Sequence, residues 1–484
     1  MSSYVQLLVG VIYLTFSTIF FSSVNAAEQR PNILFCIADD WGFGHAGVYG
    51  DKVVATPNFD RIAREGMLFR HAFSASPSCT PSRAAILTGQ YPHRLEQGGQ
   101  LHGFLPKKYP NYVDILENSG YEVGLTSKGW GPGRFVEGGY TRNPAGPVFK
   151  SFATFLEKAP VDKPFCFWLG SQDPHRPYEK GSGKNAELDA AKVRIPAYWP
   201  DNDTSRGDVL DYYFEVQRFD QLLGEAIKEL EARGQLENTL IVVTADNGMP
   251  FPRCKANLYD GGTRQPLAIR FGSKIKRGQV SEDFVNLMDL APTFIEVAGL
   301  TPPAEMTGRS LLPLLSGKDV LNTRKEVFLE RERHANVRAG DVGYPIRAVR
   351  TTEFLYIRNF EPERWPAGDP KAHKDPRREF GDVDDGLIKT FILENQNVPE
   401  YKHFFELCFG KRPSEELYEI GTDPDNVRNL AADPKYAEIK TQYRDKLQTW
   451  MKNTGDERIV EHTSRWDEYP YFGGMRGNNP VKTQ

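Results

Sequence analysis

Two short apolar runs, each ending in a pair of side chains that carry oxygen, stand out in the pattern of hydrophobic and polar positions. They span residues 32–38 and 239–245. Continuous apolar runs of this length are typical of strands buried on both faces of a mostly parallel sheet. We predict further strands over residues 121–125, 165–169 and 267–271.

Between these runs the apolar residues recur with the period of a helix. The pattern predicts helices over residues 59–65, 113–119 and 212–232, and an amphipathic helix over 284–297. Alternation of strands and helices predicts an α/β sandwich, with a large, mostly parallel central sheet flanked by helices. In such folds the site lies at the carboxyl ends of the strands.

The hydrophobic pattern and the composition of the sequence change after residue 343. Residues 346–357 alternate like a surface strand, residues 364–385 are polar and proline-containing, and residues 436–452 form a last amphipathic pattern. We therefore predict a catalytic domain over 28–343. A smaller C-terminal subdomain, with a short antiparallel sheet and a helix, is predicted over 344–484.

The first 27 residues read as a secretory signal peptide. Residues 5–21 are almost entirely apolar, and small residues at 24–27 offer a cleavage site. The segment before the apolar run has no Lys or Arg, which leaves an uncleaved anchor open. No later run approaches the length of a membrane span. We expect a secreted or periplasmic protein, lysosomal in a eukaryote, without stable membrane insertion after cleavage.

Composition narrows the possible partners. The 484 residues carry a net charge of −4 with mixed signs throughout, and no block of like charge argues for nucleic acid. A weakly acidic protein that handles an anion must concentrate its positive charge in a site. The cysteines are odd in number and not closely paired, so this is no disulfide scaffold. They are Cys36, Cys79, Cys166, Cys254 and Cys408.

The stretch from residue 78 to residue 89 predicts an anion site. Pro81 suits the first turn of a helix and Gly89 suits its end, so Cys79 lies at the helix N-terminus. Backbone N–H groups there favour an anion, and Arg83 adds a guanidinium one turn later. A phosphate or a sulfate fits this pattern. The alternative is that Cys79 is a small buried apolar residue.

The two apolar runs end in Asp39 and Asp40 and in Asp246 and Asn247. Hard oxygen ligands of this kind suit Ca²⁺ or Mg²⁺, although ordinary loop or cap acids are the alternative. A soft thiolate from Cys79 would be a poor fifth ligand among them. An oxygen in its place would make the set chemically consistent.

The run Cys79-Thr80-Pro81-Ser82-Arg83, followed by an Ala-rich turn and Thr-Gly, resembles the signature of type I sulfatases. The resemblance implies an alkaline-phosphatase-like sandwich. It also implies that a formylglycine-generating enzyme oxidises the cysteine to formylglycine, whose hydrate is the nucleophile. One Ca²⁺ would be held by five positions, all of which match here. They are Asp39, Asp40, the modified Cys79, Asp246 and Asn247.

Three further positions match sulfatase motifs. Residues 173–177 (DPHRP) resemble the Pro-His-x-Pro element, in which His175 would face the sulfate and protonate the leaving group. Lys128 and Lys255 match the two active-site lysines of the family. With Arg83 they would form a cationic cage around the SO₃ group. Taken singly, a lysine is usually a solvated surface charge and a histidine is usually structural.

One position departs from the family pattern. Trp130 stands where the family has the histidine that takes a proton from the covalent intermediate. The base of the second half-reaction is therefore unassigned. His45, His93 and His102 lie in segments that could approach the site, and the sequence does not choose among them.

Within the family the chain looks like the sulfamidase branch, the N-sulfoglucosamine sulfohydrolases. Residues 246–252, 257–259, 307–313 and 344–347 carry this likeness, which extends over roughly residues 30–450. It implies substrate-binding roles for His334 and Arg347. The branch can have an arginine at the position of Lys255, whereas a lysine there is a feature of ordinary ester sulfatases. The sugar and the type of bond that is cleaved, S–O or S–N, therefore stay open.

The sequence thus predicts a hydrolase that removes sulfate from a sulfated carbohydrate, as an ester or a sulfamate. Two alternatives stay open. One is a phosphatase or phosphodiesterase of the same superfamily, against which the chain lacks a histidine-rich second-metal set near Asp246. The other is a catalytically silent glycan-binding homologue, favoured only by Trp130.

Overall fold

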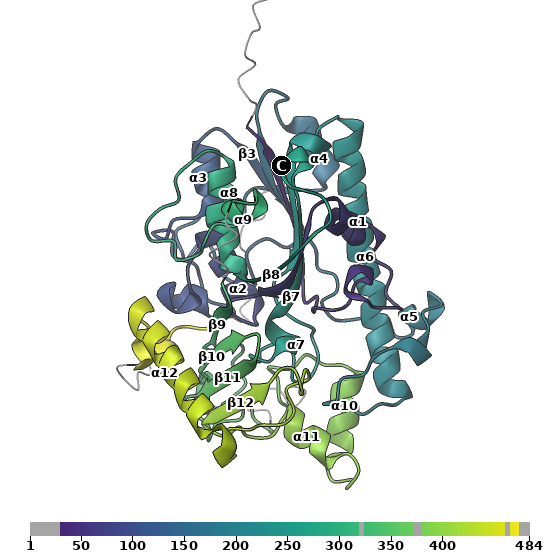
Figure 1. Ribbon diagram of the computed structural model, residues 1–484, viewed down its shortest axis with the longest axis vertical. Helices are drawn as coiled ribbons and strands as arrows, with labels where there is room; N and C mark the ends of the chain where they lie inside the picture. The colour runs from purple at the N-terminus through teal and green to yellow at the C-terminus, as the bar shows by residue number, and fades with distance from the viewer. Residues whose placement is uncertain (1–29, 319–323, 372–378, 460–464, 474–484) are drawn as a thin grey trace, which may run out of the picture. The chain divides into compact units, whose positions relative to one another are not determined.

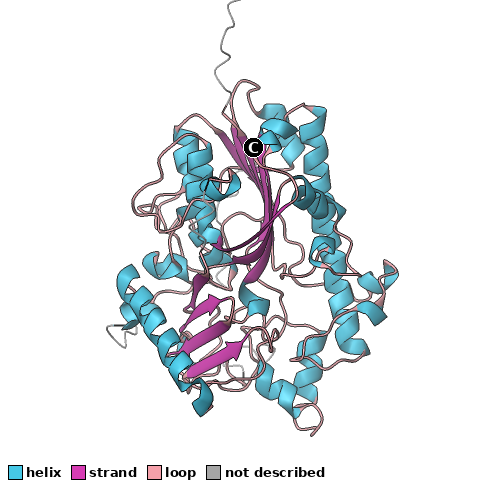
Figure 2. Cartoon of the chain, viewed as in Figure 1, coloured by secondary structure: helices cyan, strands magenta, loops and turns pink. Residues whose placement is uncertain are grey.

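The predicted strands assemble into one eight-stranded sheet in the computed structural model (Figures 1 and 2). The structure describes residues 30–318, 324–371, 379–459 and 465–473, so the predicted signal peptide lies outside the described residues. The strand order is β4-β3-β5-β1-β6-β7-β2-β8. The strands are β1 (Asn32–Ala38), β2 (Met67–Phe73), β3 (Glu122–Thr126), β4 (Val148–Phe149), β5 (Phe165–Gly170), β6 (Thr239–Ala245), β7 (Arg264–Arg270) and β8 (Gln279–Asn286).

The sheet is mostly parallel, as predicted. β1 lies at its centre and pairs in parallel with β5 and β6, whereas β7 runs antiparallel to both of its neighbours. Every residue of β1 and β6 is buried. Burial on both faces is why these strands read as continuous apolar runs rather than as alternating ones.

Helices cover both faces of this sheet (Figure 1). Leu34 and Cys36 of β1 belong to one apolar core, which includes residues of α1 (Pro57–Glu65), α4 (Phe152–Lys158) and α6 (Asp203–Ala232). Ile33, Phe35 and Ile37 belong to a second core, shared with α2 (Cys79–Thr88), α3 (Tyr112–Asn118) and α8 (Leu290–Val297). Successive residues of a strand point to opposite faces, so one run supplies both cores.

A second sheet has four antiparallel strands in the order β12-β11-β10-β9. They are β9 (Glu326–Arg331), β10 (Ile346–Thr351), β11 (Phe354–Asn359) and β12 (Glu415–Glu419). Helix α12 (Ala437–Thr454) covers it, with Trp450 stacked on Phe328 at 4.9 Å between ring centroids. The predicted small antiparallel sheet with a helix is thus confirmed. The first strand of this sheet lies before residue 344, and the boundary at 343/344 stays a prediction.

Two local predictions differ from the structure. The helix expected over 284–297 is confirmed only for α8 from Leu290 on; residues up to Asn286 belong to strand β8, and a 3-10 turn over Leu287–Asp289 lies between. Asn286 ends the strand because its side chain accepts the Met288 N–H while Asp289 accepts the Asn286 N–H, a capping arrangement that starts a helix. The surface strand expected over 346–357 is instead the hairpin of β10 and β11. All six residues of β10 are buried.

The remaining α-helices are short. They are α5 (Ser182–Asn185), α7 (Asp260–Thr263), α9 (Leu312–Leu315), α10 (Leu387–Glu394), α11 (Lys402–Cys408) and α13 (Arg465–Glu468). Among the described residues, no helix combines the length and the apolar character needed to cross a bilayer. All five cysteines fall within the described residues, and each is free and buried.

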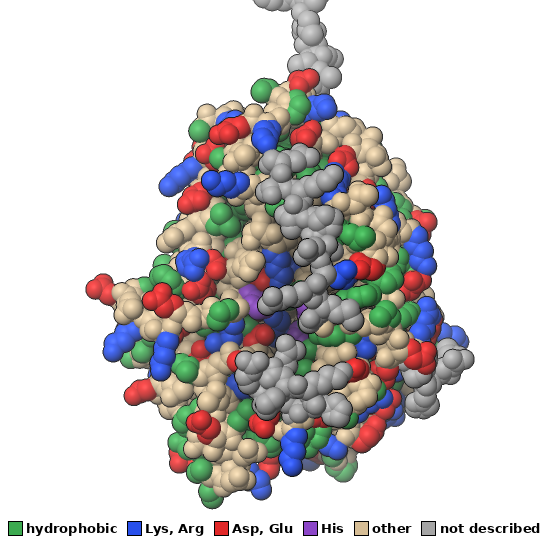
Figure 3. Space-filling model, turned by 180° about the vertical axis from the view of Figure 1, so that it is seen from behind, with side chains coloured by type: hydrophobic (Ala, Val, Ile, Leu, Met, Phe, Trp, Pro, Cys, Tyr) green, Lys and Arg blue, Asp and Glu red, His purple; other side chains and the backbone are tan. Residues whose placement is uncertain are grey.

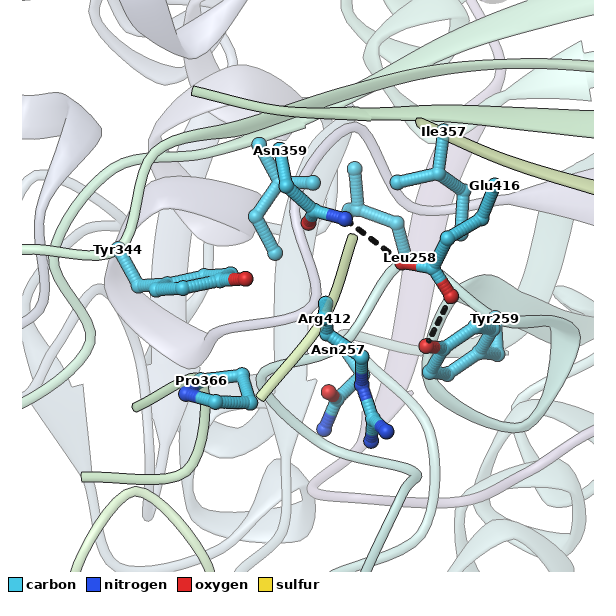
Figure 4. A pocket seen from close by; sticks show the side chains of 10 residues that line it. Asn257, Leu258, Tyr259, Tyr344, Ile357, Asn359, Pro366, Arg412 and Glu416 are labelled. Atoms are coloured by element: carbon cyan, nitrogen blue, oxygen red, sulfur yellow. Dashed lines mark hydrogen bonds between the residues drawn. The ribbon is translucent and has the colours of Figure 1, made fainter. Parts of the chain in front are cut away.

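Two of the sulfamidase-like motifs meet between the sheets. Asn257, Leu258 and Tyr259 line a cavity of about 10 Å³ together with Tyr344, which lies just before β10, and with residues of the second sheet (Figure 4). Glu416 closes it by accepting hydrogen bonds from Tyr259 Oη at 2.8 Å and from an asparagine amide at 2.7 Å. The space is close to that of one water molecule. These motifs therefore join the two sheets.

Candidate functional site

The carboxyl ends of β1 and β6 bring four oxygen-bearing side chains together. The two strands run parallel and end in step, so the residues that follow them lie at the same sheet edge. The Asp40 N–H donates to Asp246 Oδ1 at 3.1 Å, and Asn247 Nδ2 donates to Asp40 Oδ1 at 2.6 Å. Asp39, Asp40, Asp246 and Asn247 are each at most 1% exposed.

Helix α2 carries Cys79 to these acids. It begins at Cys79 and ends at Thr88, with Gly89 in the left-handed region at φ 62°, as the sequence predicts. Cys79 Sγ lies 3.5 Å from Asp39 Oδ1. Burial raises the pKa of the Cys79 thiol well above its usual value, and the nearby lysines do not reverse this. An unmodified thiol here would be a poor nucleophile because it stays protonated.

Three cations surround the acids. Arg83 Nε lies 2.7 Å from Asp246 Oδ2, and its Nη1 donates to the carbonyls of residues 128 and 129. Lys128 Nζ lies 2.5 Å from Asp39 Oδ2. Lys255 Nζ lies 2.8 Å from Asp40 Oδ2. All three predicted basic residues therefore meet at the start of α2.

His175 faces the same acids from the loop after β5. Its Nδ1 donates to the Arg176 carbonyl at 2.5 Å, which leaves Nε2 as the nitrogen that points to the site. Nε2 lies 3.8 Å from Asp40 Oδ2. The imidazole is 33% exposed, whereas the acids behind it are buried. His175 is thus placed to contact a ligand that enters from solvent.

The oxygen set fits a hard divalent cation. Asn247 Oδ1 is buried and has no hydrogen-bond partner within the described residues, although its amide nitrogen is fully used. A buried carbonyl oxygen without a donor is costly unless a cation or another donor meets it. Oxygen atoms of Asp39 and Asp40 and the Cys79 sulfur lie within 4.8 Å of one another. Carboxylates with an amide oxygen are the ligands that Ca²⁺ prefers.

The two adjacent aspartates differ in acidity. Burial raises the pKa of both carboxyls, but Lys128 and Arg83 outweigh it for Asp39, whose pKa falls well below the usual range. For Asp40, burial and the charges of Asp39 and Asp246 dominate over Lys255 and raise the pKa to about 6. A bound cation would favour the ionised form of both.

His334 and Arg347, the predicted substrate-binding residues, lie in different surroundings. His334 Nδ1 is hydrogen-bonded to Ser78 Oγ at 2.8 Å, directly before Cys79, and burial lowers its pKa to about 3. Arg347 is fully buried and binds Asp456 at 2.6 Å and Glu332 at 2.6 Å. The structure brings His334 to the start of α2, and it places Arg347 in an ion-pair network inside the second sheet.

Trp130 does not replace the absent histidine. Its backbone N–H and carbonyl are held by the Asn143 side chain, and its ring packs in the second core. His45 is hydrogen-bonded to Tyr212, and His93 to Glu330 at 2.7 Å. The His102 ring packs against the Tyr471 ring. These contacts are not with Cys79 or with the acids around it.

Asp384 belongs to the site, and sequence reasoning missed it. Its Oδ2 lies 3.2 Å from Lys255 Nζ, and its carboxylate lies within 4.8 Å of the ligand atoms of Asp40 and His175. Burial raises the pKa of this carboxyl, but Lys255, His175 and His334 outweigh it and lower the pKa to about 2. Asp384 lies in a polar, proline-containing stretch that offers no motif. Only the fold brings it to the site.

Part of this site opens to solvent. Seen from behind, histidine side chains and those of Lys or Arg gather in a hollow near the middle of that face (Figure 3). Lys128, His175 and Asp384 have side-chain exposures of 16%, 33% and 29%. Lys128, His175 and Asp384 thus form the accessible rim, whereas Arg83 and Lys255 are buried with the acids.

Comparisons with known proteins give the family. The sulfatase family model matches residues 31–300, more than half of the chain, and the chain therefore belongs to the sulfatase family. A second model, the C-terminal region of N-sulphoglucosamine sulphohydrolase, matches residues 254–385, which include Asp384. The chain is 31% identical to N-sulphoglucosamine sulphohydrolase of Homo sapiens over 476 residues, which covers 89% of this chain and 91% of that relative. Within the family it is thus similar to the sulfamidase branch.

Other relatives and solved structures are also similar over most of this chain. An ulvan-active sulfatase of Formosa agariphila is 29% identical over 455 residues, covering 89% of this chain and 82% of the relative. Among solved structures, an enzyme in complex with its substrate D-glucosamine-2-N,6-O-disulfate has a TM-score of 0.64 at 19% identity, covering 90% of this chain and 100% of the other. A phosphonate monoester hydrolase of Agrobacterium radiobacter has a TM-score of 0.63 at 19% identity, covering 90% and 99%. These structures share the fold.

Proposed function

We propose that this sulfatase removes sulfate from a sulfated carbohydrate through an oxygen nucleophile at residue 79. The observation that carries the proposal is the position of Cys79. Its side chain lies 3.5 Å from Asp39 at the start of a buried helix, surrounded by Arg83, Lys128 and Lys255. Three cations and a helix N-terminus around one short side chain suit an anion that reacts there.

Two groups would complete the site. Asp39, Asp40, Asp246 and Asn247 would hold one Ca²⁺ together with residue 79. Formylglycine made from Cys79 by a formylglycine-generating enzyme would supply, as its hydrate, the hydroxyl nucleophile, which the Ca²⁺ would hold and acidify. An oxygen at residue 79 also removes the mismatch between a soft sulfur and a hard cation.

Side chains of the protein would stabilise the reacting sulfate group and protonate the leaving group. Arg83, Lys128 and Lys255 would neutralise the charge that builds on the SO₃ oxygens, in a site where buried charges act strongly. His175 would deliver a proton from Nε2 to the departing sugar oxygen or nitrogen. The proton-accepting base for sulfate release stays unassigned, because Trp130 carries none.

The substrate class follows from the relatives, and export is a separate proposal. Relatives named for N-sulphoglucosamine, N-acetylgalactosamine-6-sulfate and ulvan all act on sulfated sugars by name, which supports a carbohydrate substrate here. Export through the predicted signal peptide rests on the sequence of residues 1–27. The substrate position and the bond type are left to experiment.

The test combines mass and turnover. The full chain is produced together with a formylglycine-generating enzyme, and the tryptic peptide that carries residue 79 is weighed. Sulfate release is followed from glucosamine N-sulfate, glucosamine 6-sulfate and an aryl sulfate, with phosphate release from the matched aryl phosphate. We expect an aldehyde at residue 79, sulfate release, and no turnover by Cys79→Ala. Turnover by a protein with an intact thiol, or preference for the phosphate ester, would overturn the proposal.

A further inference from the structure

The reaction proposed above leaves Asp384 without a role. Its carboxylate lies 3.2 Å from Lys255 Nζ and within 4.8 Å of the ligand atoms of His175 and Asp40. A negative charge at this distance opposes the binding of an anionic sulfate. A carboxylate in an anion site therefore calls for a partner other than the sulfate.

The loop that carries Asp384 is held on its N-terminal side by the second sheet. Asp382 forms ion pairs with Arg331 and with Arg338, the latter at 2.6 Å. Asp382 also accepts the Ala335 N–H at 2.9 Å, next to His334. These groups are buried, so the loop cannot swing away without leaving buried charges unpaired.

The C-terminal side of the loop is held by the His175 loop. Arg176 and the Ile388 N–H both bind Asp208, at 2.8 Å and 3.1 Å. Gly386 packs against the same guanidinium, because a Cβ there would lie 2.4 Å from Arg176 Cζ. Asp384 is thus fixed relative to the imidazole of His175.

Asp384 has acceptor capacity to spare. Its Oδ2 is buried and meets Lys255 Nζ in an ion pair at 3.2 Å, and no hydrogen-bond donor of well-aligned geometry reaches that oxygen within the described residues. The side chain keeps 29% of its surface exposed, beside a His175 that is 33% exposed. The exposed part of the carboxylate therefore faces the same opening as the imidazole.

We propose that Asp384 accepts a hydrogen bond from a hydroxyl or amino group of the sugar, next to the sulfated atom. The inference rests on the proposed function, in which His175 marks the leaving-group side. A donor from the sugar would pair with the carboxylate, whereas a second sulfate in that place would be repelled. Asp384 would thus select sugars with an O–H or N–H donor beside the scissile bond.

The experiment compares a sugar with a substrate that has no such donor. The full chain, matured with formylglycine, is assayed for kcat/KM on 4-nitrophenyl sulfate and on glucosamine N-sulfate and 6-sulfate. The variants are Asp384→Ala, Asp384→Asn and the control Asp385→Asn. Asp385 is the adjacent carboxylate, is 78% exposed and pairs with Lys389. Thermal unfolding of each variant checks that the fold is kept.

We expect Asp384→Ala to lower kcat/KM for the cleaved sugar about 10- to 100-fold, the worth of a charge-assisted hydrogen bond. The aryl sulfate should change less than about threefold or gain, because a negative charge has left an anion site. The kcat/KM of Asp384→Asn for the sugar should lie between those of Asp384→Ala and the wild type. The kcat/KM of Asp385→Asn should equal that of the wild type. Which of the two glucosamine sulfates responds tells which side of the sugar ring Asp384 contacts.

The results that would contradict the role of Asp384 differ from those that would contradict the proposed function. An equal loss of kcat/KM on the sugar and on the aryl sulfate would mean that Asp384 only positions Lys255. An unchanged kcat/KM on the sugar would mean that Asp384 does not contact the sugar. Either result overturns the inference while the proposed function stands. A wild-type protein that carries the aldehyde and releases sulfate from neither kind of substrate overturns the proposed function and this inference with it.

Discussion

Arg83→Met tests whether the cluster of charges is balanced as the structure indicates. The guanidinium is fully buried, lies 2.7 Å from Asp246 and 3.5 Å from Asp39, and donates to two backbone carbonyls. Methionine keeps much of the stem and removes the charge. Breaking a buried pair by removing one partner costs roughly 3–5 kcal/mol. We expect a loss of that order in the free energy of unfolding in EDTA.

The same change should strengthen cation binding. Asp39, Asp40 and Asp246 face Arg83, Lys128 and Lys255, so removing one cation leaves an excess negative charge. At about 5 Å and an effective dielectric constant of about 20, the interaction of one unit charge with a divalent ion is worth several kcal/mol. Screening by solvent reduces this energy to about 1–3 kcal/mol. We therefore expect Ca²⁺ to bind roughly 5- to 100-fold more tightly. Ca²⁺ should also restore part of the lost stability.

The assay is urea unfolding with and without Ca²⁺, together with calorimetric Ca²⁺ titration and sulfate release. Arg270→Met is the control, because Arg270, the last residue of β7, is also buried and pairs with Glu65 and Glu237, two acids outside the proposed metal site. It should lose less stability, because Glu65 and Glu237 are 24% and 62% exposed and water can solvate them, and its Ca²⁺ affinity should be unchanged. Equal Ca²⁺ affinities of Arg83→Met and wild type, or full turnover by Arg83→Met, would refute the charge balance.

Three further changes have defined outcomes. Lys255→Met should lower kcat/KM for sulfate release about 10²- to 10³-fold, the usual cost of removing one group that stabilises transition-state charge, and a loss under threefold would contradict its role. Burial lowers the pKa of His93, but Glu330 outweighs it and raises the pKa above its usual value. This pair therefore stabilises the fold below pH 6.5 and ceases to do so as pH rises through the raised pKa, so Glu330→Gln should cost more stability at pH 5.5 than at pH 9 in urea unfolding. Gly386→Ala should force Arg176 aside and lower stability by about 1–3 kcal/mol with a loss of turnover, and an unchanged melting temperature would contradict the close packing.

The parts of the fold that the sequence predicts well are those with a local cause. The bounds of β1 and β6 agree with the prediction to the residue, because burial on both faces leaves an uninterrupted apolar run. Cys79 begins α2 because Pro81 and Gly89 define the two ends of a helix locally. The acids after each strand meet because parallel strands end at one edge.

What the sequence could not supply depends on partners far along the chain. Arg347 is buried at 0% exposure because Asp456, 109 residues away, neutralises it, and no local pattern shows this. Asp384 reaches Lys255 because Asp382 and Gly386 fix the loop between two distant segments. The run over 284–297 was misread because a short apolar stretch suits a strand or a helix equally well.

The burial of α2 bears on when the proposed oxidation of Cys79 could take place. Every residue of this helix is buried, and Cys79 itself is 2% exposed. In the folded protein the Cys79 sulfur is therefore closed to a second protein. If Cys79 is oxidised as proposed above, the oxidation would have to precede the folding of α2. Protein purified with the thiol intact would have to be unfolded before any later treatment could activate it.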